Sequence, residues 1–120
     1  MTKIIHTDEF DRDLKKLAKK YKSLFDDIAV LEKALSTVRI EPIRDTPRIS
    51  NLGVKYENYP VYKVRSFRCR MINKGLRSGF RIIYYDDIKS DTIHLIQMYY
   101  KSTTENEDSE RIKKFLDRLI

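Results

Sequence analysis

A strip of positive charge with interleaved aromatic rings runs from residue 62 to residue 85 of this 120-residue chain. The strip contains no carboxylate, and its cations are Lys63, Arg65, Arg68, Arg70, Lys74, Arg77 and Arg81. The whole chain has 25 Lys and Arg against 18 Asp and Glu, so these cations account for its net charge of +7. Concentrated positive charge with aromatic side chains is typical of surfaces that hold a polyanion, and the sequence therefore predicts RNA or DNA binding.

The same residue types could also cut RNA. Attack by the neighbouring 2′-hydroxyl needs a base, stabilisation of charge on the phosphoryl oxygens, and an acid for the leaving 5′-oxygen. Arg81 suits the second task, because a guanidinium is planar and stays charged. Lys63 could serve as acid or base if the nearby charges of Arg65 and Arg81 lower its pKa. Binding without cleavage stays open at this point, because basic strands more often form binding surfaces than active sites.

No metal, cofactor or nucleophile motif accompanies the basic strip. The chain has no Gly-rich phosphate loop, no Cys and His cluster of metal-ligand spacing, and no Ser nucleophile motif. His6 and His94 form no recognisable pair, and the acidic residues fall mostly at expected helix starts and turns. We therefore expect neither a metal nor a cofactor.

Length and composition bound the class of protein. A chain of 120 residues with 41% hydrophobic residues predicts one domain over residues 1–120. The N-terminus has no apolar run of signal or membrane length, and a single cysteine fits a reducing compartment. The expectation is a cytoplasmic protein without a membrane partner.

Helical periodicity marks a pair of helices in the first third of the chain. Over residues 8–21 the apolar positions are Phe10, Leu14, Leu17 and Tyr21, and Thr7 or Asp8 can cap this helix. A second helix is expected to begin near Ser23, with Asp26 as a capping-box partner. Its expected apolar stripe is Phe25, Ile28, Leu31, Leu35 and Val38. Because few residues separate the two helices, they should form an antiparallel hairpin.

The period changes to two after an irregular, proline-containing stretch at residues 39–60. On the strand beginning at Val61, Tyr62 and Val64 should share one face, with Lys63 and Arg65 on the other. Residues 71–79 form a basic loop, and the return strand should place Arg81, Ile83 and Tyr85 together on one face.

The remaining segments complete the predicted fold. Residues 3–7 suit a first or edge strand, residues 92–101 a central strand, and residues 110–120 a last helix. Consecutive strands joined by short turns form a meander. The fold class is therefore α+β, with the helical hairpin packed on a small antiparallel sheet and a C-terminal helix following it.

Three short runs resemble the RelE/ParE superfamily of toxins from type II toxin–antitoxin pairs. They read YKVRSF at residues 62–67, GFRIIYY at residues 79–85 and LIQMYYK at residues 95–101, with the basic loop between the first two. The lysine- and glycine-containing loop is most similar to the HigB branch. The element order matches from about residue 10 to residue 119, and the match is sharpest over residues 61–101.

The resemblance implies a metal-independent messenger-RNA endonuclease that cuts the codon in the A site of the 70S ribosome and so inhibits translation. It also implies a cognate antitoxin that covers the basic face with an acidic or amphipathic segment. By the family pattern, the catalytic positions fall on Lys63, Arg65, Arg81 and Lys101. Loop residues Lys74 and Arg77 would face RNA, and Arg68 and Arg70 extend the same basic strip.

The chain departs from the family pattern after Lys101. RelE-like nucleases usually carry an Arg next and a Tyr further on, but here Ser102 and an acidic run through residue 110 follow. The general acid is therefore open, with Tyr85, Tyr99 and Tyr100 as candidates. Glu105 or Glu107 would repel a phosphate unless it serves as the base. A ParE-like gyrase inhibitor and a catalytically silent RNA-binding homologue remain as alternatives.

Overall fold

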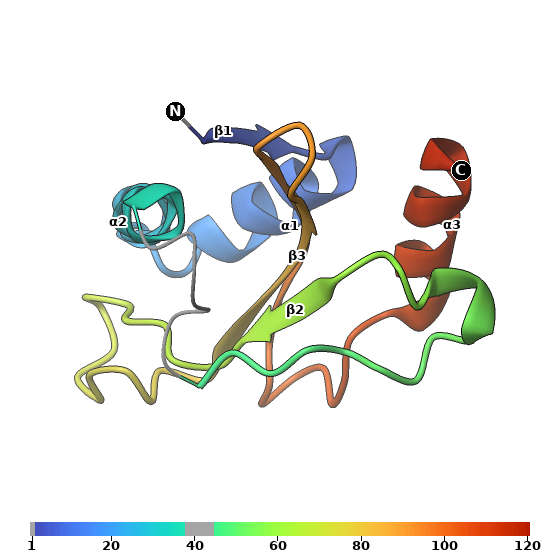
Figure 1. Ribbon diagram of the computed structural model, residues 1–120. Helices are drawn as coiled ribbons and strands as arrows, with labels where there is room; N and C mark the ends of the chain where they lie inside the picture. The colour runs from blue at the N-terminus through green and yellow to red at the C-terminus, as the bar shows by residue number, and fades with distance from the viewer. Residues whose placement is uncertain (1, 38–44) are drawn as a thin grey trace.

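A computed structural model describes residues 2–37 and 45–120 of the chain. Its elements are β1 (Lys3–His6), α1 (Asp8–Ala18), α2 (Leu24–Thr37), the 3-10 helix η1 (Val54–Tyr56), β2 (Val61–Val64), β3 (Phe80–Asp87), β4 (Thr92–Tyr100) and α3 (Ser109–Leu119). The hairpin of α1 and α2 lies on one side of the sheet and α3 lies on the other (Figure 1). The predicted α+β class is thereby confirmed.

The sheet has the strand order β1-β4-β3-β2. Strands β2, β3 and β4 form the predicted antiparallel meander, but β1 pairs parallel to β4, with Lys3 opposite Thr92. The expectation of a purely antiparallel sheet was therefore wrong. No short turn links β1 to β4, so hairpin geometry does not fix their relative direction. Strand β4 is flanked on both sides, which explains its apolar side chains on both faces.

Helix α1 begins as the sequence predicts. The Thr7 hydroxyl oxygen accepts the Phe10 backbone N–H at 3.1 Å, which satisfies one of the free donors of the first turn. The helix ends at Ala18, earlier than the predicted Tyr21. Tyr21 then packs edge-on against Phe80, with ring centroids 5.3 Å apart, and thereby joins the hairpin to the sheet.

The buried stripe of α2 includes the predicted Ile28, Leu31 and Leu35, but Leu24 takes the place of the predicted Phe25. Its buried apolar residues are Leu24, Ile28, Leu31 and Leu35. Phe25 was predicted to be buried and is 55% exposed instead. The helix begins at Leu24, and residues four and seven positions after Leu24 share its face, so Phe25 points about 100° away from the sheet. The predicted stripe residue Val38 lies outside the described residues.

A buried carboxylate fixes the connection between β2 and β3 to α2. Asp27 accepts the Ser23 hydroxyl at 2.7 Å, and the backbone N–H and Nε of Arg70 at 3.2 Å each. Arg70 also donates to Asp26 at 2.9 Å. Asp26 therefore pairs with the loop, and the Ser23 side chain bonds to Asp27. These bonds hold the first part of the basic loop against the helical hairpin.

The free edge of β2 is covered by an extended segment that precedes it. The backbone N–H groups of Lys63 and Arg65 donate to the carbonyls of Pro47 and Asp45, at 3.0 and 3.2 Å. Proline has no N–H to offer a strand, but its carbonyl can still accept at an edge. This segment brings the Asp45 side chain next to the end of β2.

His6 joins three elements at the end of β1. Its Nδ1 lies 2.6 Å from the Asp11 carboxylate on α1, and its Nε2 bonds the Glu32 carboxylate on α2. Burial opposes protonation of His6, but the hydrogen bonds that its ring donates to the Glu32 and Asp11 carboxylates, with their negative charges, raise its pKa above 6.5. The protonated ring is thus the form that links the three elements.

Stability should therefore depend on pH through His6. A raised folded-state pKa means that the stabilisation is complete below pH 6.5 and is lost as the pH rises through that raised value. We expect the difference in unfolding free energy between wild type and His6→Gln to shrink steadily from pH 6 to pH 8.5. Urea titrations of both proteins measure this difference, and a constant difference over the range would contradict the role of His6.

Candidate active site

The predicted catalytic residues of three strands meet at one end of the sheet, on the face that carries α3. Arg81 of β3 lies directly opposite Tyr99 of β4. Lys63 of β2 lies opposite Ile83, two residues further along β3 and on the same face as Arg81. The buried side chains of that face form a cluster with α3, so α3 covers its apolar part and leaves the charged end uncovered. The structure therefore brings Lys63, Arg81 and Tyr99 together.

A bulge in β4 brings Tyr99 to this face. Ile83 pairs with Gln97 but Tyr84 pairs with Leu95, so Ile96 is an extra residue in β4. If β4 alternated strictly from Leu95, which packs under the helical hairpin, with no bulge, Tyr99 would lie four residues on and under the hairpin as well. With the bulge, Tyr99 joins the α3 side and faces Arg81.

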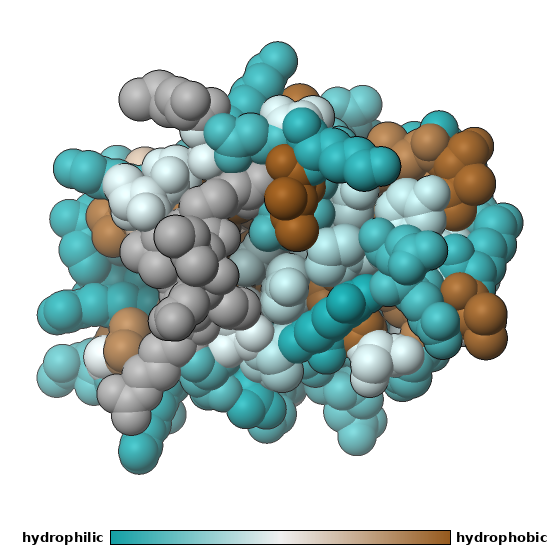
Figure 2. All heavy atoms as spheres, in the orientation of Figure 1, coloured by the Kyte–Doolittle hydropathy of each residue, from teal (hydrophilic) through white to brown (hydrophobic). Residues whose placement is uncertain are grey.

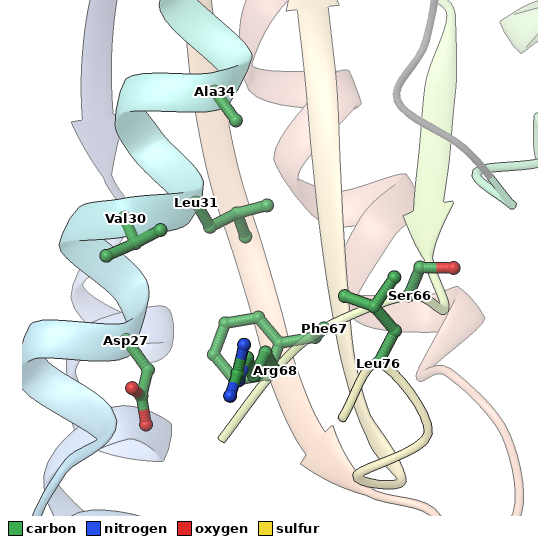
Figure 3. Close-up of a pocket in the computed structure, with 8 residues that line it drawn as sticks. All are labelled: Asp27, Val30, Leu31, Ala34, Ser66, Phe67, Arg68 and Leu76. Carbon is green, nitrogen blue, oxygen red and sulfur yellow. The ribbon is translucent and has the colours of Figure 1, made fainter. Parts of the chain in front are cut away.

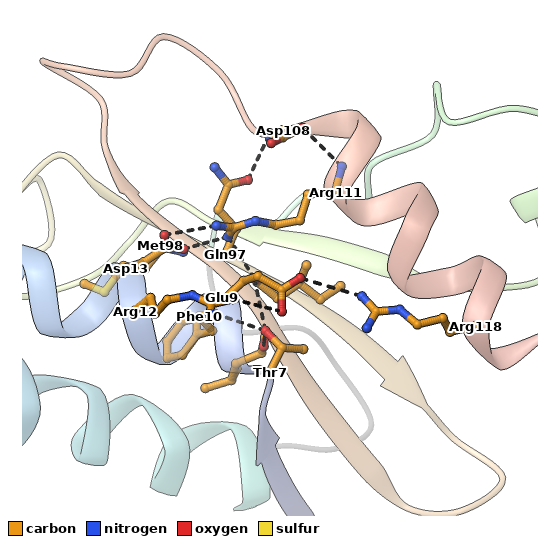
Figure 4. Close-up of polar contacts among 12 residues, drawn as sticks. Thr7, Glu9, Phe10, Arg12, Asp13, Gln97, Met98, Asp108, Arg111 and Arg118 are labelled. Carbon is orange, nitrogen blue, oxygen red and sulfur yellow. Dashed lines mark hydrogen bonds and ion pairs between the residues drawn. The ribbon is translucent and has the colours of Figure 1, made fainter.

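The bulge is held by an ion pair between helices far apart in the chain. The Asp13 carboxylate of α1 accepts the Met98 backbone N–H at 3.0 Å and the Arg111 guanidinium of α3 at 2.6 and 3.0 Å (Figure 4). Arg111 also donates to the Ile96 carbonyl at 3.0 Å. The Met98 N–H and the Ile96 carbonyl at the bulge thus both have partners, which fix the bulge to α1 and α3.

Glu107 completes the cluster from the segment before α3. Its carboxylate accepts the Lys63 ammonium at 2.7 Å and the Tyr99 hydroxyl. Side chains of this ion pair are largely enclosed, with 20% of Lys63 and 13% of Glu107 exposed. The nearby Gln97 side chain accepts the Asp108 N–H at 2.8 Å, which fixes the backbone beside Glu107.

The charges of the cluster are set by these contacts. Burial alone would raise the pKa of Glu107, but hydrogen bonds from Lys63 and Tyr99 and the positive charge of Lys63 lower it. Burial, together with the negative charge of Glu107, raises the pKa of Tyr99 to about 12 against the opposing effect of Arg81. At neutral pH the site therefore holds a carboxylate and a protonated phenol, each hydrogen-bonded to the other.

A polar depression of about 720 Å³ opens beside this cluster. Its lining residues are Asp45, Arg65, Ser66, Leu76, Arg77, Gly79 and Arg81. Among the described residues, the Arg81 side chain makes two hydrogen bonds, both long, at 3.4 Å to the Arg65 carbonyl and 3.3 Å to the Phe80 carbonyl. Its guanidinium is therefore available to an anion in the depression, and Arg65 and Arg77 add further positive charge.

Gly79 shapes the wall of the depression. Its φ is +93°, and a Cβ built there would lie 3.0 Å from the Tyr100 ring. Only glycine adopts this conformation readily and leaves space for the ring. Its carbonyl accepts the Lys101 N–H at 2.9 Å, which closes the β3–β4 pair beside Arg81.

The other predicted residues divide between the depression and other places. Arg65 follows β2 and donates its Nε to Asp45 at 3.0 Å. Arg68 and Lys74 are exposed on the connecting loop, and Lys101 is exposed just after β4. Tyr85 lies apart from the cluster: it pairs with Val61, packs against α3, and its pKa is raised by burial.

Neither Asp13 nor Asp45 was among the predicted site residues, and Glu107 was a poorer candidate than the tyrosines. Asp13 and Arg111 lie 98 residues apart, so no local spacing connects them. The only available signal for Glu107 was an acidic run placed just after a basic strand, which does not reveal which carboxylate turns inward.

An apolar groove lies next to the polar depression, between α2 and the basic loop (Figure 3). It measures about 250 Å³, and its lining residues are Asp27, Val30, Leu31, Ala34, Ser66, Phe67, Arg68 and Leu76. Val30 and Leu76 are 72% and 52% exposed, a high exposure for side chains of this kind. Ser66 and Leu76 line both hollows, so the groove and the depression are neighbours.

Much of the remaining surface is polar. Figure 2 shows one face covered mainly by hydrophilic side chains, with apolar ones in small separate groups. Among residues 2–37 and 45–120, no helix is both long and apolar enough to cross a membrane. Within the same residues, no group of three or more His, Cys, Asp or Glu side chains is placed to hold a metal ion.

Comparison with known proteins gives a likeness of fold. No family model matches the chain, and no curated protein matches it either. The crystal structure of a metal-bound toxin from Helicobacter pylori superposes with a TM-score of 0.58 at 18% identity, covering 87% of this chain and 99% of that one. The solution structure of a conserved hypothetical protein from the same organism gives a TM-score of 0.49 at 18% identity, covering 85% of this chain and 97% of that one. The first likeness supports the α+β fold described above.

Proposed function

We propose that this chain is the toxin of a toxin–antitoxin pair and that it cuts messenger RNA on the ribosome. The observation that carries the proposal is the meeting of Lys63, Arg81, Tyr99 and Glu107 beside a depression lined by arginines. These are the groups that metal-independent phosphodiester cleavage needs: a phosphate-binding cation, an acid and a base. The fold shared with a Helicobacter pylori toxin agrees with the proposal.

Arg81 is the proposed anchor for the scissile phosphate. Its side chain projects from a central strand, lines the depression and has no carboxylate among the hydrogen-bond partners found for it. Arg65 forms an ion pair with Asp45, but 47% of its side chain is exposed, so an RNA phosphate can compete with Asp45 for the guanidinium. A rigid strand holds a phosphate-binding guanidinium more accurately than a loop does.

The basic loop is proposed to hold RNA on either side of the cut. Arg68, Lys74 and Arg77 are exposed there, and the chain's net charge of +7 favours approach to a polyanion. Messenger RNA and ribosomal RNA both present this chemistry in the A site of the 70S ribosome, in the cytoplasm. Tyr99 lies opposite Arg81, and Lys101, exposed just after β4, is proposed to add a further cation to the site.

The proposed antitoxin is an acidic amphipathic helix that binds the apolar groove. The groove borders the arginine-lined depression, so a helix with its apolar side chains on Val30 and Leu76 could place carboxylates over Arg65 and Arg81. Such a segment would neutralise the site and exclude RNA. The excess of positive charge in the basic loop supports an acidic partner.

Val30→Glu should weaken antitoxin binding without harming the toxin. Val30 is 72% exposed, so the fold should lose less than about 0.5 kcal/mol. A carboxylate in the apolar groove should lower affinity at least about tenfold for the protein encoded next to this chain in its genome. Isothermal titration with that protein measures the loss. Val54→Glu, at an exposed site on η1, is the matched control, and equal binding by both variants would contradict the groove assignment.

Two assays separate the proposed function from its alternatives. In a cell-free translation reaction, the protein should stop reporter synthesis and shorten the reporter messenger RNA. In a gyrase supercoiling assay it should have no effect. Loss of supercoiling with intact messenger RNA would instead identify a gyrase inhibitor, and RNA binding with neither effect would identify a silent binding protein.

A further inference from the structure

The carboxylate of Glu107 accepts hydrogen bonds from two other side chains of the cluster, Lys63 and Tyr99. Lys63, Tyr99 and Arg81 lie on three neighbouring strands, and all three present proton donors to that face. Arg81 stays charged at any working pH, and Tyr99 is protonated at neutral pH because its pKa is about 12. Lys63 donates to Glu107 at 2.7 Å. Glu107 is therefore the acceptor within this group.

We propose that Glu107 is the general base of the RNA cleavage reaction, an assignment that rests on the proposed function. Its carboxylate is enclosed, with 13% of the side chain exposed, and held from two sides by Lys63 and Tyr99. That orientation is fixed before substrate arrives, which is what proton transfer from a bound hydroxyl requires. Tyr99 acts as a positioning residue through its hydrogen bond to Glu107.

The proton balance of this step follows from the ion pair. Glu107 takes the proton of the 2′-hydroxyl while the 2′-oxygen forms a bond to phosphorus. The bond from phosphorus to the 5′-oxygen breaks, and that oxygen takes a proton from the Lys63 ammonium. The products are a 2′,3′-cyclic phosphate and a 5′-hydroxyl end. Protonated Glu107 then returns its proton to neutral Lys63 across their hydrogen bond, which restores the resting pair.

Asp45 is the competing carboxylate, since it also lines the depression. It forms an ion pair with Arg65 at the sheet edge, and 44% of its side chain is exposed. No contact joins Asp45 to Lys63 or Tyr99 among the interactions found for the described residues. Asp45 is thus a partner of Arg65, whereas Glu107 is the carboxylate that contacts Lys63 and Tyr99.

The test compares three carboxylate variants, Glu107→Gln, Glu105→Gln and Asp45→Asn. It measures single-turnover cleavage of a synthetic messenger RNA bound in the ribosomal A site. Glu107→Gln should lose at least about 100-fold in rate, the scale of a general base, while binding RNA as tightly as wild type or more tightly. Glu105→Gln, an exposed neighbour in the same segment, should cut at the wild-type rate. Melting temperatures show whether each variant is folded.

A second substrate distinguishes a base from a structural residue. RNA with sulfur in place of the bridging 5′-oxygen has a leaving group that needs no proton. It should restore cleavage by Lys63→Met but not by Glu107→Gln. The assignment is overturned if the sulfur-containing RNA restores cleavage by Glu107→Gln, or if Glu107→Gln cuts normal RNA at the wild-type rate. If Asp45→Asn alone loses about 100-fold in cleavage rate, the base is Asp45 instead. A wild-type protein that binds but never cuts this RNA contradicts the proposed function, and the assignment with it.

Discussion

Replacing Arg81 with alanine should reduce messenger-RNA cleavage at least about 100-fold, the scale for losing one preorganised donor to a developing oxyanion. The guanidinium lines the depression, and its two hydrogen bonds within residues 2–37 and 45–120 are both long and both to backbone carbonyls. The fold should therefore change little, by about 0.5 kcal/mol or less. Single-turnover rates and thermal melts on the same preparations measure both quantities.

A matched control removes the same charge elsewhere. Arg12 lies on α1 with 74% of its side chain exposed and only a 4.0 Å contact to Glu9. Arg12→Ala has the same net charge as Arg81→Ala and should cut within about twofold of wild type. If the two variants cut equally well, positive charge in general carries the activity, and Arg81 is not the phosphate anchor.

Replacing Asp13 with alanine should cost about 3 kcal/mol of stability, with loss of activity. The change removes three hydrogen bonds and leaves the Met98 N–H and the Arg111 guanidinium without their acceptor. Only 21% of Asp13 and 20% of Arg111 are exposed, so water replaces the carboxylate poorly. Because the bulge sets the direction of Tyr99, the site should be disturbed even where the protein remains folded.

Urea unfolding measures the stability part of this prediction. Asp117→Ala is the comparison, since it breaks a more exposed ion pair with Lys55 and should leave the urea midpoint much closer to that of the wild type. Adding Arg111→Met to Asp13→Ala should recover part of the loss, because an apolar side chain leaves no unpaired charge. Equal midpoints for Asp13→Ala and Asp117→Ala would show that the ion pair does not hold the bulge.

The sequence was sufficient where regular periodicity decides the outcome. Alternation along β2 and β3 correctly placed Tyr62 and Val64 on the helical side, and Lys63 opposite them. The Thr7 cap and the interior position of β4 also followed from local patterns. These features depend on residues within a few positions of one another, so a single sequence carries the information.

The sequence was insufficient where distant segments meet. A bulge at Ile96 is invisible to a strict period of two, and its cause is a carboxylate on α1 and a guanidinium on α3. The burial of Glu107 also depends on contacts between separate segments, because Gln97 and Lys63 hold the segment before α3 in place. Phe25 failed for a smaller reason: Leu24, four positions before Ile28, takes the buried place at the start of the helix, and the apolar pattern did not choose between these two neighbours.

The most direct test of the central claim is to map messenger-RNA 5′ ends in a cell-free translation reaction. The reaction is run with the wild-type protein, with Arg81→Ala, and with ribosomes omitted. We expect new 5′-hydroxyl ends within the reading frame for the wild type, and their absence in the other two reactions. An unchanged set of 5′ ends with translation proceeding normally would contradict the ribosome-dependent nuclease.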